Sequence, residues 1–507
     1  MKIKYVTTPI YYVNDLPHIG HAYTSIICDI YARFFKLKNY DIIFLTGTDE
    51  HGQKVENAAK NKGIEPLTFV NSVSKNFVDL TKNLNITNTD FIRTTELRHR
   101  KTVEKVWKKL IEKDEIYLGS YEGWYSVKDE SFFQEKELKE KNGIFFTDDG
   151  SKVDWLKEES YFFKLSKWEN KLLNYYENNP NFIQPKSRRN EVISFVKSGL
   201  NDLSISRTSF KWGISVPEQT NNHIIYVWID ALTNYLSAIQ YFDDNEFKEN
   251  FWQEVVHVIG KDILKFHAVY WPAILMALGI SPPKKIFAHG WWTNEGKKIS
   301  KSLNNSIDPN KVISTYGLDQ FRYFVTKEIT LGQDGDFSEK SLINRSNSDL
   351  SNSLGNLIQR TLKFVEKHYE NAMPIGVDSI KCKILESGYK LLDEIESNIE
   401  NFEFHKALEK IWKFIADLNQ FIDEKEPWRT VKENKLETAE TLGVLLESFR
   451  LLGLILQPFI PCASEKILNI LNIKDNLRNF DYFNKEYSIK KDTYFNKIEQ
   501  LFPRFNV

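Results

Sequence analysis

The sequence contains few cysteines. There are only three, Cys28, Cys382 and Cys462, and they lie far apart along the chain. This spacing provides neither a disulfide framework nor a paired metal knuckle, and it is typical of a protein in a reducing compartment. The chain also lacks an apolar N-terminal run with a cleavage site, and it has no uncharged apolar stretch of about 20 residues. We therefore predict a cytoplasmic protein that does not bind a membrane.

The sequence also has no excess of charge of either sign. It carries 68 basic and 69 acidic residues, which leave a formal net charge of −1. No global electric field would draw such a chain to nucleic acid, so any contact with RNA must come from local patches. With 507 residues, of which 41% are hydrophobic, we expect about three globular domains, each able to bury apolar surface of its own.

The first 65 residues predict two strand-then-helix units. Residues 3–8 favour a strand, and the apolar residues from Ile26 to Phe35 recur at helical spacing. A second apolar run, DIIFLTG, precedes the helical pattern of KVENAAKNKG. Repeated units of this kind favour an α/β fold with a parallel, doubly wound sheet.

Changes in the pattern divide the rest of the chain. Between 118 and 222 charged residues, glycine and proline interrupt the aromatics, which indicates an inserted module. Strand and helix patterns resume afterwards, and from about 340 only helical periodicity remains. We predict a sheet domain formed by residues 1–117 and 223–340, an insertion at 118–222, and an all-α helix bundle at 341–507.

The stretch PHIGHAYT places two histidines around Gly20, where the first strand gives way to a helix. A helix start offers unpaired N–H groups and partial positive charge to an anion. His18 and His21 could donate hydrogen bonds to oxygens that gain charge during a reaction. The alternative is that the pair caps the helix or packs in the core. The position at a strand's carboxyl end favours the ligand site.

The stretch GKKISKSLNN follows the last strand-like run, KIFAHGWW. A solvated surface loop is the alternative interpretation, but a basic loop at this sheet edge could close on a polyphosphate through charged hydrogen bonds. Neither motif has the GxxxxGK[ST] pattern, so P-loop phosphate transfer is disfavoured.

These two motifs resemble the HIGH and KMSKS signatures of class I aminoacyl-tRNA synthetases. The stretches TTPIYYVNDLPHIGHAYT, FLTGTDEHG, YVWIDALTNY, VIGKDILKFHAVYWPAIL and DLSNSLGNLIQR resemble methionyl-tRNA synthetases along nearly the whole chain. The resemblance implies a Rossmann-type catalytic domain split by a connective insertion and an α-helical anticodon-binding domain. It also implies that methionine is activated to methionyl-adenylate with ATP and Mg²⁺ and then transferred to the 3′ end of tRNA(Met).

The resemblance also implies roles for individual residues. His18, Gly20 and His21 would bind ATP, with both histidines holding its phosphates. Lys301, helped by Lys298, would bind pyrophosphate. Gly260 and Asp262 would contact the ATP ribose, although Asp262 could instead be a simple helix cap.

Asp49 would pair with the ammonium group of methionine, and His51 beside it would be structural. The methionine pocket must be apolar and must offer a donor to the thioether, for which Tyr235 and His267 are the candidates. Core packing is the alternative for each aromatic taken alone, and Leu232 stands where some members have proline. The matching pocket positions are Ile10, Tyr12, Trp228, Ala231, Leu232, Tyr235, Ile263, His267 and Trp271.

Asn352, Asn356 and Arg360 are spaced by four and share one helix face, which suits the edges of unstacked bases. The resemblance places anticodon recognition at Asn356, Arg360 and Trp428, with a base stacked on the indole. The alternative for the helix face is that it is simply polar surface of the bundle. The alternative for Trp428 is that its side chain plugs the interior of the bundle.

The sequence departs from many relatives near GWYSVKDESFF, where paired cysteines would hold zinc. Ser126 and Asp129 stand there, and no cysteine lies between 29 and 381. We predict no structural zinc. The chain ends soon after the bundle, so we predict a monomer. A small nucleotidyltransferase and a non-catalytic tRNA-binding homologue are the other functions considered. The helix bundle argues against the first, and the intact HIGH and KISKS motifs argue against the second.

Overall fold

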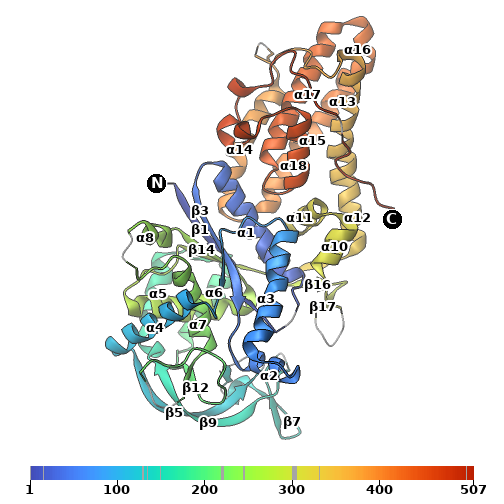
Figure 1. Cartoon of the computed structure of the whole chain (residues 1–507). Coiled ribbons are helices and arrows are strands. Elements are labelled where there is room, and N and C mark those ends of the chain that lie inside the picture. The colour runs from blue at the N-terminus through green and yellow to red at the C-terminus, as the bar shows by residue number, and fades with distance from the viewer. Residues whose placement is uncertain are drawn as a thin grey trace.

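A computed structural model describes residues 2–14, 16–127, 131–133, 135–148, 150–218, 222–243, 246–299, 305–330, 332–378, 380–497 and 499–506. Figure 1 shows the sheet and the insertion at one end of the molecule and the C-terminal helices at the other, with α1, α10 and α11 between them. Within these ranges, no helix has both the length and the apolar character needed to cross a bilayer.

The main sheet is parallel and has seven strands in the order β10-β15-β14-β1-β3-β2, with β4 also paired to β3. The central strand β1 pairs with β14 on one side and with β3 on the other, so the sheet continues across the predicted insertion. The predicted parallel α/β sheet is confirmed. Its strands are β1 (Ile3–Thr7), β2 (Tyr11–Tyr12), β3 (Asp41–Asp49), β4 (Asp90–Arg93), β10 (Ile183–Gln184), β14 (Val255–Gly260) and β15 (Lys285–His289).

The segment after β14 does not continue directly into one regular α-helix. It forms a 3₁₀ turn at Lys261–Ile263 and a π-helical turn at Phe266–Tyr270 before α9 begins. Pro272 has no N–H with which to reach the carbonyl of Ala268, which disfavours a continuous α-helix. That carbonyl accepts a hydrogen bond from the Tyr176 hydroxyl at 2.6 Å instead. The other helices of this part are α1 (Ile19–Leu37), α2 (Gln53–Asn61), α3 (Pro66–Asn83), α4 (Leu97–Glu112), α7 (Val227–Ala238), α8 (Glu246–Gln253) and α9 (Trp271–Leu278).

The insertion contains an antiparallel sheet in the order β11-β9-β5-β6. However, β10 lies within the predicted insertion and pairs with β15, so the main sheet takes an edge strand from this segment. The boundaries at 118 and 222 therefore stay a prediction. The elements are β5 (Ile116–Ser126), β6 (Ser131–Phe133), β7 (Lys139–Lys141), β8 (Ile144–Phe146), β9 (Asp154–Phe163), α5 (Glu169–Asn178), α6 (Lys186–Lys197), β11 (Leu203–Ser204), β12 (Ser206–Arg207) and β13 (Ile224–Ile225).

A small three-stranded sheet and two helices lead into the bundle, which is helical as predicted. The sheet joins β16 (Trp292–Asn294), β17 (Lys297–Lys298) and β18 (Gly335–Phe337). The two helices that lead into the bundle are α10 (Pro309–Tyr316) and α11 (Leu318–Lys327). The helices that follow are α12 (Glu339–Arg345), a π-helical stretch (Ser346–Gly355), α13 (Asn356–Tyr369), α14 (Lys383–Glu400), α15 (Phe404–Lys425), α16 (Pro427–Glu433), α17 (Lys435–Ile455) and α18 (Pro461–Ile470).

The apolar clusters extend across the predicted domain boundaries. The largest apolar cluster runs from α1 through α11 into the bundle, and a second cluster covers the other face of the sheet and reaches the insertion. The reason lies in α1, where Ile26, Ile27, Ile30, Tyr31 and Phe34 are all buried. Every position from Ala22 to Ala32 is buried, so the helix is covered on all sides; the sheet alone cannot do this, and the bundle covers the rest.

Candidate active site

The two histidines of PHIGHAYT cap the first turn of α1. His18 is the N-cap residue, and its Nδ1 accepts a hydrogen bond from the Gly20 N–H at 3.1 Å. His21 Nδ1 accepts from the His18 N–H, also at 3.1 Å. These two bonds form a reciprocal capping box, so the capping alternative is realised.

Capping does not consume both nitrogens of either ring. Because Nδ1 is the acceptor in each bond, a neutral imidazole carries its hydrogen on Nε2. The ring centroids are 3.9 Å apart. Burial, together with the neighbouring His18, lowers the pKa of His21 well below its ordinary value, so this ring is neutral at physiological pH. Capping thus fixes a tautomer in which Nε2–H is the donor end of the ring.

Gly20 provides space for the His18 ring. A Cβ atom at Gly20 would lie 2.9 Å from His18 Cε1, closer than carbon atoms tolerate without a shift. The bare backbone is therefore needed to seat the capping imidazole, in addition to the nucleotide contact that the resemblance implies.

The ends of β14 and β15 lie beside this turn. The Thr24 hydroxyl and His289 Nε2 are 2.8 Å apart, which joins α1 to the end of β15. His289 is paired in register with Gly260 of β14. Asp262 follows Gly260, and its Oδ1 accepts a hydrogen bond from Trp291 Nε1 at 3.2 Å. The predicted ATP residues Gly20, Gly260 and Asp262 therefore lie at one edge of the sheet.

The KISKS segment is only partly described. Lys298 is the last residue of β17, and this strand is hydrogen-bonded to β16. Strand β16 begins at Trp292, shortly after β15 ends at His289. Residues 300–304 lie outside the described residues, and Lys301 is among them. Its contact with a polyphosphate stays a prediction.

The predicted methionine residues come from three places around the strand ends. Ile10 and Tyr12 follow β1, and Tyr12 is paired in register with Asp49 at the end of β3. The Trp228 ring stacks on Phe266 with centroids 3.7 Å apart. The remaining positions lie on α7 (Ala231, Leu232, Tyr235) and on the turns after β14 (Ile263, His267) or the start of α9 (Trp271).

The two candidate thioether donors are hydrogen-bonded to each other. His267 Nδ1 lies 3.0 Å from the Ile263 carbonyl, to which it must donate. Burial lowers the pKa of His267 to about 4, so the neutral ring accepts at Nε2 from the Tyr235 hydroxyl at 2.8 Å. In this arrangement the Tyr235 hydroxyl hydrogen and the His267 Nδ1 hydrogen are both already donated. Either residue could donate to the methionine thioether only after giving up its present hydrogen bond.

Sequence reasoning missed one residue, Asp230, which joins α7 to the end of β3. Asp230 of α7 is fully buried, and its two oxygens accept hydrogen bonds from His51 Nδ1 and His99 Nε2, both at 2.6 Å. Burial alone would raise the pKa of Asp230, but the two histidines lower it to about 2. The Asp230 carboxylate thus ties α7 to the end of β3, two residues beyond Asp49.

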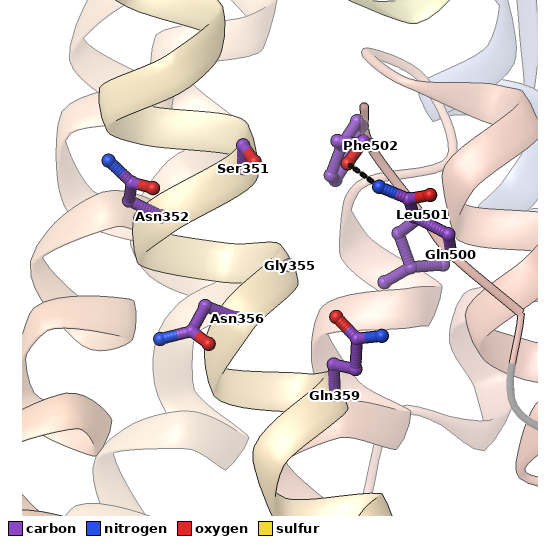
Figure 2. Close-up of a pocket in the computed structure, with 8 residues that line it drawn as sticks. All are labelled: Ser351, Asn352, Gly355, Asn356, Gln359, Gln500, Leu501 and Phe502. Atoms are coloured by element: carbon purple, nitrogen blue, oxygen red, sulfur yellow. Dashed lines mark hydrogen bonds between the residues drawn. The ribbon is translucent and has the colours of Figure 1, made fainter. Parts of the chain in front are cut away.

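The predicted anticodon residues lie on the long helix of the bundle. Figure 2 shows Asn352 and Asn356 on one side of it and Gln359 turned toward Gln500 of the C-terminal segment. Arg360 donates to Asp423 Oδ1 of α15 at 3.0 Å. A cavity of about 150 Å³ lies between helix and segment, lined by Ser351, Asn352, Gly355, Asn356, Gln359, Gln500, Leu501 and Phe502. The C-terminal residues carried no sequence signal, because their place follows only from the chain folding back.

Trp428 stands at the start of α16 and is 48% exposed, so it does not plug the bundle. In the insertion, Ser126 is buried, and Asp129 lies outside the described residues. Across the part of the chain that the structure describes, no group of three or more histidine, cysteine or acidic side chains could hold a metal.

Comparison with known proteins covers nearly the whole chain. Residues 4–144 and 146–362 match the family model for class I tRNA synthetases (M), and residues 380–506 match that for the anticodon-binding domain of methionyl tRNA ligase. The methionine–tRNA ligase of Rickettsia conorii is 50% identical over 506 residues, which is 99% of each chain. That of Brucella suis is 45% identical over 479 residues, covering 94% of this chain and 93% of its own.

Solved structures of methionyl-tRNA synthetases also match this chain over nearly its whole length. The methionyl-tRNA synthetase of Mycobacterium tuberculosis in complex with methionyl-adenylate superposes with a TM-score of 0.96 at 42% identity, covering 99% of this chain and all of that one. Its apo form gives a TM-score of 0.89 at 40% identity, with 100% and 99% covered. The sequence, the split sheet and the helical bundle agree with these findings, and the chain belongs to the methionyl-tRNA synthetase family of class I aminoacyl-tRNA synthetases.

Proposed function

We propose that this chain activates L-methionine with ATP to form methionyl-adenylate and transfers the methionyl group to the 3′ end of tRNA(Met). The observation that carries the proposal is the relation to methionine–tRNA ligases over the full length of the chain, at 50% identity with that of Rickettsia conorii. The histidine pair of α1, with its capping box intact, is the part of the site that suits this chemistry best.

In the activation step the methionine carboxylate attacks the α-phosphorus of ATP, and pyrophosphate leaves. Negative charge develops on the phosphate oxygens as this happens. His18 and His21 can donate to those oxygens from Nε2, and the start of α1 adds partial positive charge. Lys298 and Lys301 would bind the departing pyrophosphate, and Asp262 would accept from ribose hydroxyls. We expect Mg²⁺ to arrive bound to the phosphates of ATP.

Methionine would lie between β3 and α7, with its ammonium group at Asp49, a side chain that is only 7% exposed. An apolar wall near Trp228 and Ile10 suits the thioether chain. Selectivity against amino acids that differ by one methylene is worth only about 1–3 kcal/mol, so a polar contact to sulfur is needed as well. Tyr235 or His267 would supply it after exchanging their mutual hydrogen bond.

Recognition of tRNA would use Asn352, Asn356 and Arg360 on the helix face and Trp428 as a stacking platform. The ion pair of Arg360 with Asp423 has side-chain exposures of 31% and 62%, so a base edge can compete for the guanidinium. We further propose that the protein acts as a monomer in the cytoplasm and holds no structural zinc.

Amino-acid-dependent exchange of pyrophosphate into ATP tests the function. Purified full-length protein, assayed with a panel of amino acids, is expected to exchange pyrophosphate with methionine far faster than with leucine or valine. A preference for another amino acid would contradict the methionine assignment. An absence of exchange with every amino acid would contradict activation itself.

Replacing Trp428 by alanine is expected to lower kcat/KM for charging of tRNA(Met) by about tenfold, since stacking on one base contributes about 1–3 kcal/mol. Pyrophosphate exchange should not change, because Trp428 belongs to α16, at the opposite end of the molecule from the sheet (Figure 1). Leu436→Ala is a matched control, since Leu436 is 62% exposed at the start of α17, beside α16. Equal losses of charging and exchange in Trp428→Ala would indicate a folding role instead.

A further inference from the structure

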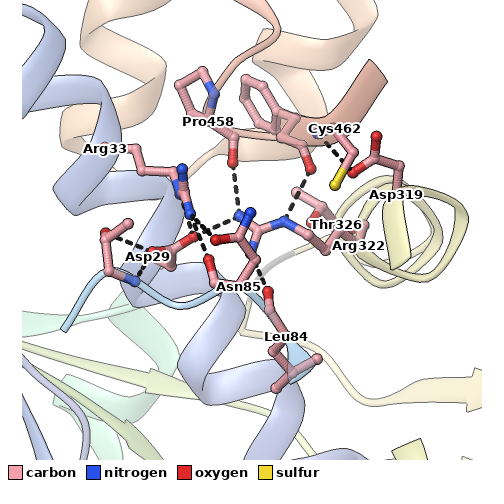
Figure 3. Close-up of polar contacts among 11 residues, drawn as sticks. Asp29, Arg33, Leu84, Asn85, Asp319, Arg322, Thr326, Pro458 and Cys462 are labelled. Atoms are coloured by element: carbon pink, nitrogen blue, oxygen red, sulfur yellow. Dashed lines mark hydrogen bonds and ion pairs between the residues drawn. The ribbon is translucent and has the colours of Figure 1, made fainter. Parts of the chain in front are cut away.

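Helix α1, α11 and the loop before α18 meet at a buried arginine. Figure 3 shows Arg322 of α11 between Asp29 of α1 and the carbonyl of Pro458. The side chains of Arg322 and Asp29 are both fully buried. The arginine donates to Asp29 Oδ2 at 2.7 Å, to Pro458 O at 2.8 Å and to Phe459 O at 3.2 Å. One guanidinium therefore joins the helix that begins with His18 to the helical bundle.

The fourth bond of Arg322 reaches the end of α3, at Leu84 O with a distance of 3.1 Å. One turn earlier on α11, Asp319 accepts from the backbone N–H of Cys462 at 3.3 Å and of Ala463 at 2.6 Å, at the first turn of α18. Two charged residues of α11 thus hold the 458–463 loop. A planar guanidinium suits such a set of acceptors, whereas an ammonium group cannot bond in several fixed directions.

Asp29 has a second arginine, but within its own helix. Arg33 Nε donates to Asp29 Oδ2 at 2.7 Å, four residues along α1. Burial alone would raise the pKa of Asp29, yet Arg322 and Arg33 lower it below its ordinary value. Both arginines therefore neutralise the same carboxylate, but only Arg322 connects it to the bundle. This difference separates a charge effect from a positioning effect.

The geometry of α1 makes its position important. Residues 18 and 29 are eleven positions apart, which corresponds to about 16 Å along a helix, so a tilt of about 4° at Asp29 would move the first turn by about 1 Å. Displacements of about 1 Å can slow a positioned reaction about 100-fold. Helix α1 and the bundle share an apolar core, but apolar contacts have no preferred direction. The buried ion pair of Asp29 and Arg322 adds a directional contact at this junction.

We propose that Asp29 and Arg322 are positioning residues for adenylate formation. They hold α1 against the 458–463 loop so that His18 and His21 stay aligned with the ATP phosphates. The inference rests on the proposed function, because it assigns the pair an effect on that reaction. It predicts that breaking the link slows the chemical step without weakening the binding of methionine.

Pyrophosphate exchange by full-length variants tests the pair. Arg322→Lys keeps the charge but loses the forked bonds to the carbonyls, and it is expected to lower kcat about tenfold while KM for methionine stays within about twofold. The double variant Asp29→Asn with Arg322→Gln removes both charges of the buried pair and leaves only the partly exposed Arg33 without its carboxylate, so it is expected to fold with the same loss of kcat. Arg33→Gln, the matched control, should keep kcat within about twofold of the unmodified chain.

Thermal unfolding of each variant, followed by circular dichroism, reports whether it is folded. A normal kcat in both Arg322 variants would overturn the inference, and so would an equal slowing by Arg33→Gln or a parallel rise in KM. A double variant that does not fold would show that the pair is purely structural. If the unmodified chain exchanges no pyrophosphate, the proposed function fails instead, so the two failures are distinguishable.

Discussion

Replacing His21 by alanine is expected to slow methionine-dependent pyrophosphate exchange by about 10²–10³-fold, the loss typical for a donor aimed at developing negative charge. KM for methionine should change little, since the ring lies at the start of α1 and Asp49 and Trp228 come from other elements. Steady-state exchange kinetics with varied methionine would separate the two parameters. An unchanged rate would remove His21 from the mechanism.

The capping role of His21 requires its own control. Alanine also removes the acceptor for the His18 N–H, which should lower the free energy of unfolding by about 1 kcal/mol. His21→Asn keeps a short side-chain oxygen at this position but no Nε2–H. We expect it to restore stability in urea unfolding while exchange stays slow. Recovery of both stability and rate would mean that capping is all that His21 contributes.

Replacing Asp230 by alanine is expected to have the largest effect on stability and to damage methionine binding at the same time. His51 and His99 would lose the acceptor that each now has at 2.6 Å, in a site where Asp230 is fully buried. Removing one partner of a buried charged network costs about 3–5 kcal/mol. Urea unfolding should show this loss. Because Asp230 ties α7 to the end of β3, KM for methionine should also rise about tenfold or more.

Asp230→Asn is the matched variant, because it keeps the shape and one acceptor. It is expected to fold and to bind methionine better than the alanine variant. If the asparagine and alanine variants lose the same free energy of unfolding, the carboxylate geometry is unimportant. If KM for methionine is normal in Asp230→Ala, the link between α7 and Asp49 does not shape the pocket.

The stability contribution of Asp230 has a defined pH range. Its pKa falls from 3.8 to about 2 on folding, so the unfolded chain binds the proton more readily. The contribution, about 2 kcal/mol, is fully present above pH 4 and is lost as the pH falls through about 2. The difference in unfolding free energy between the unmodified chain and Asp230→Asn should therefore stay constant from pH 8 to pH 5. A difference that already shrinks between pH 8 and pH 5 would contradict the assignment to the Asp230 carboxylate.

The local patterns of the sequence predicted the elements well. Strands at 3–8 and DIIFLTG, the helix that begins within PHIGHAYT and the helical C-terminal third are all confirmed. These features depend on neighbours within one or two turns of chain, so periodicity and helix signals contain them. The π-helical turn at Phe266–Tyr270 was missed although Pro272 was visible, because a proline weakens the helix without saying what replaces it.

Long-range polar contacts were the part that local patterns missed. Asp230 lies in the apolar stretch YVWIDALTNY, and its partners are 179 and 131 residues away. Arg322 carried no signal either, since its acceptor Asp29 is 293 residues distant and its other partners are backbone carbonyls, which every residue possesses. A sequence pattern cannot identify a partner that is defined only by folding.

The sequence by itself determined the elements, the order of the motifs and the family to which the chain belongs, because these follow from local residue patterns. The tertiary structure alone decided that α1 is shared by sheet and bundle, which nitrogens of His18 and His21 cap the helix, and which residues hold α7 and α11 in place. Burial makes these choices, because an apolar helix must be covered on every side and a buried charge must find its partner wherever the fold provides one.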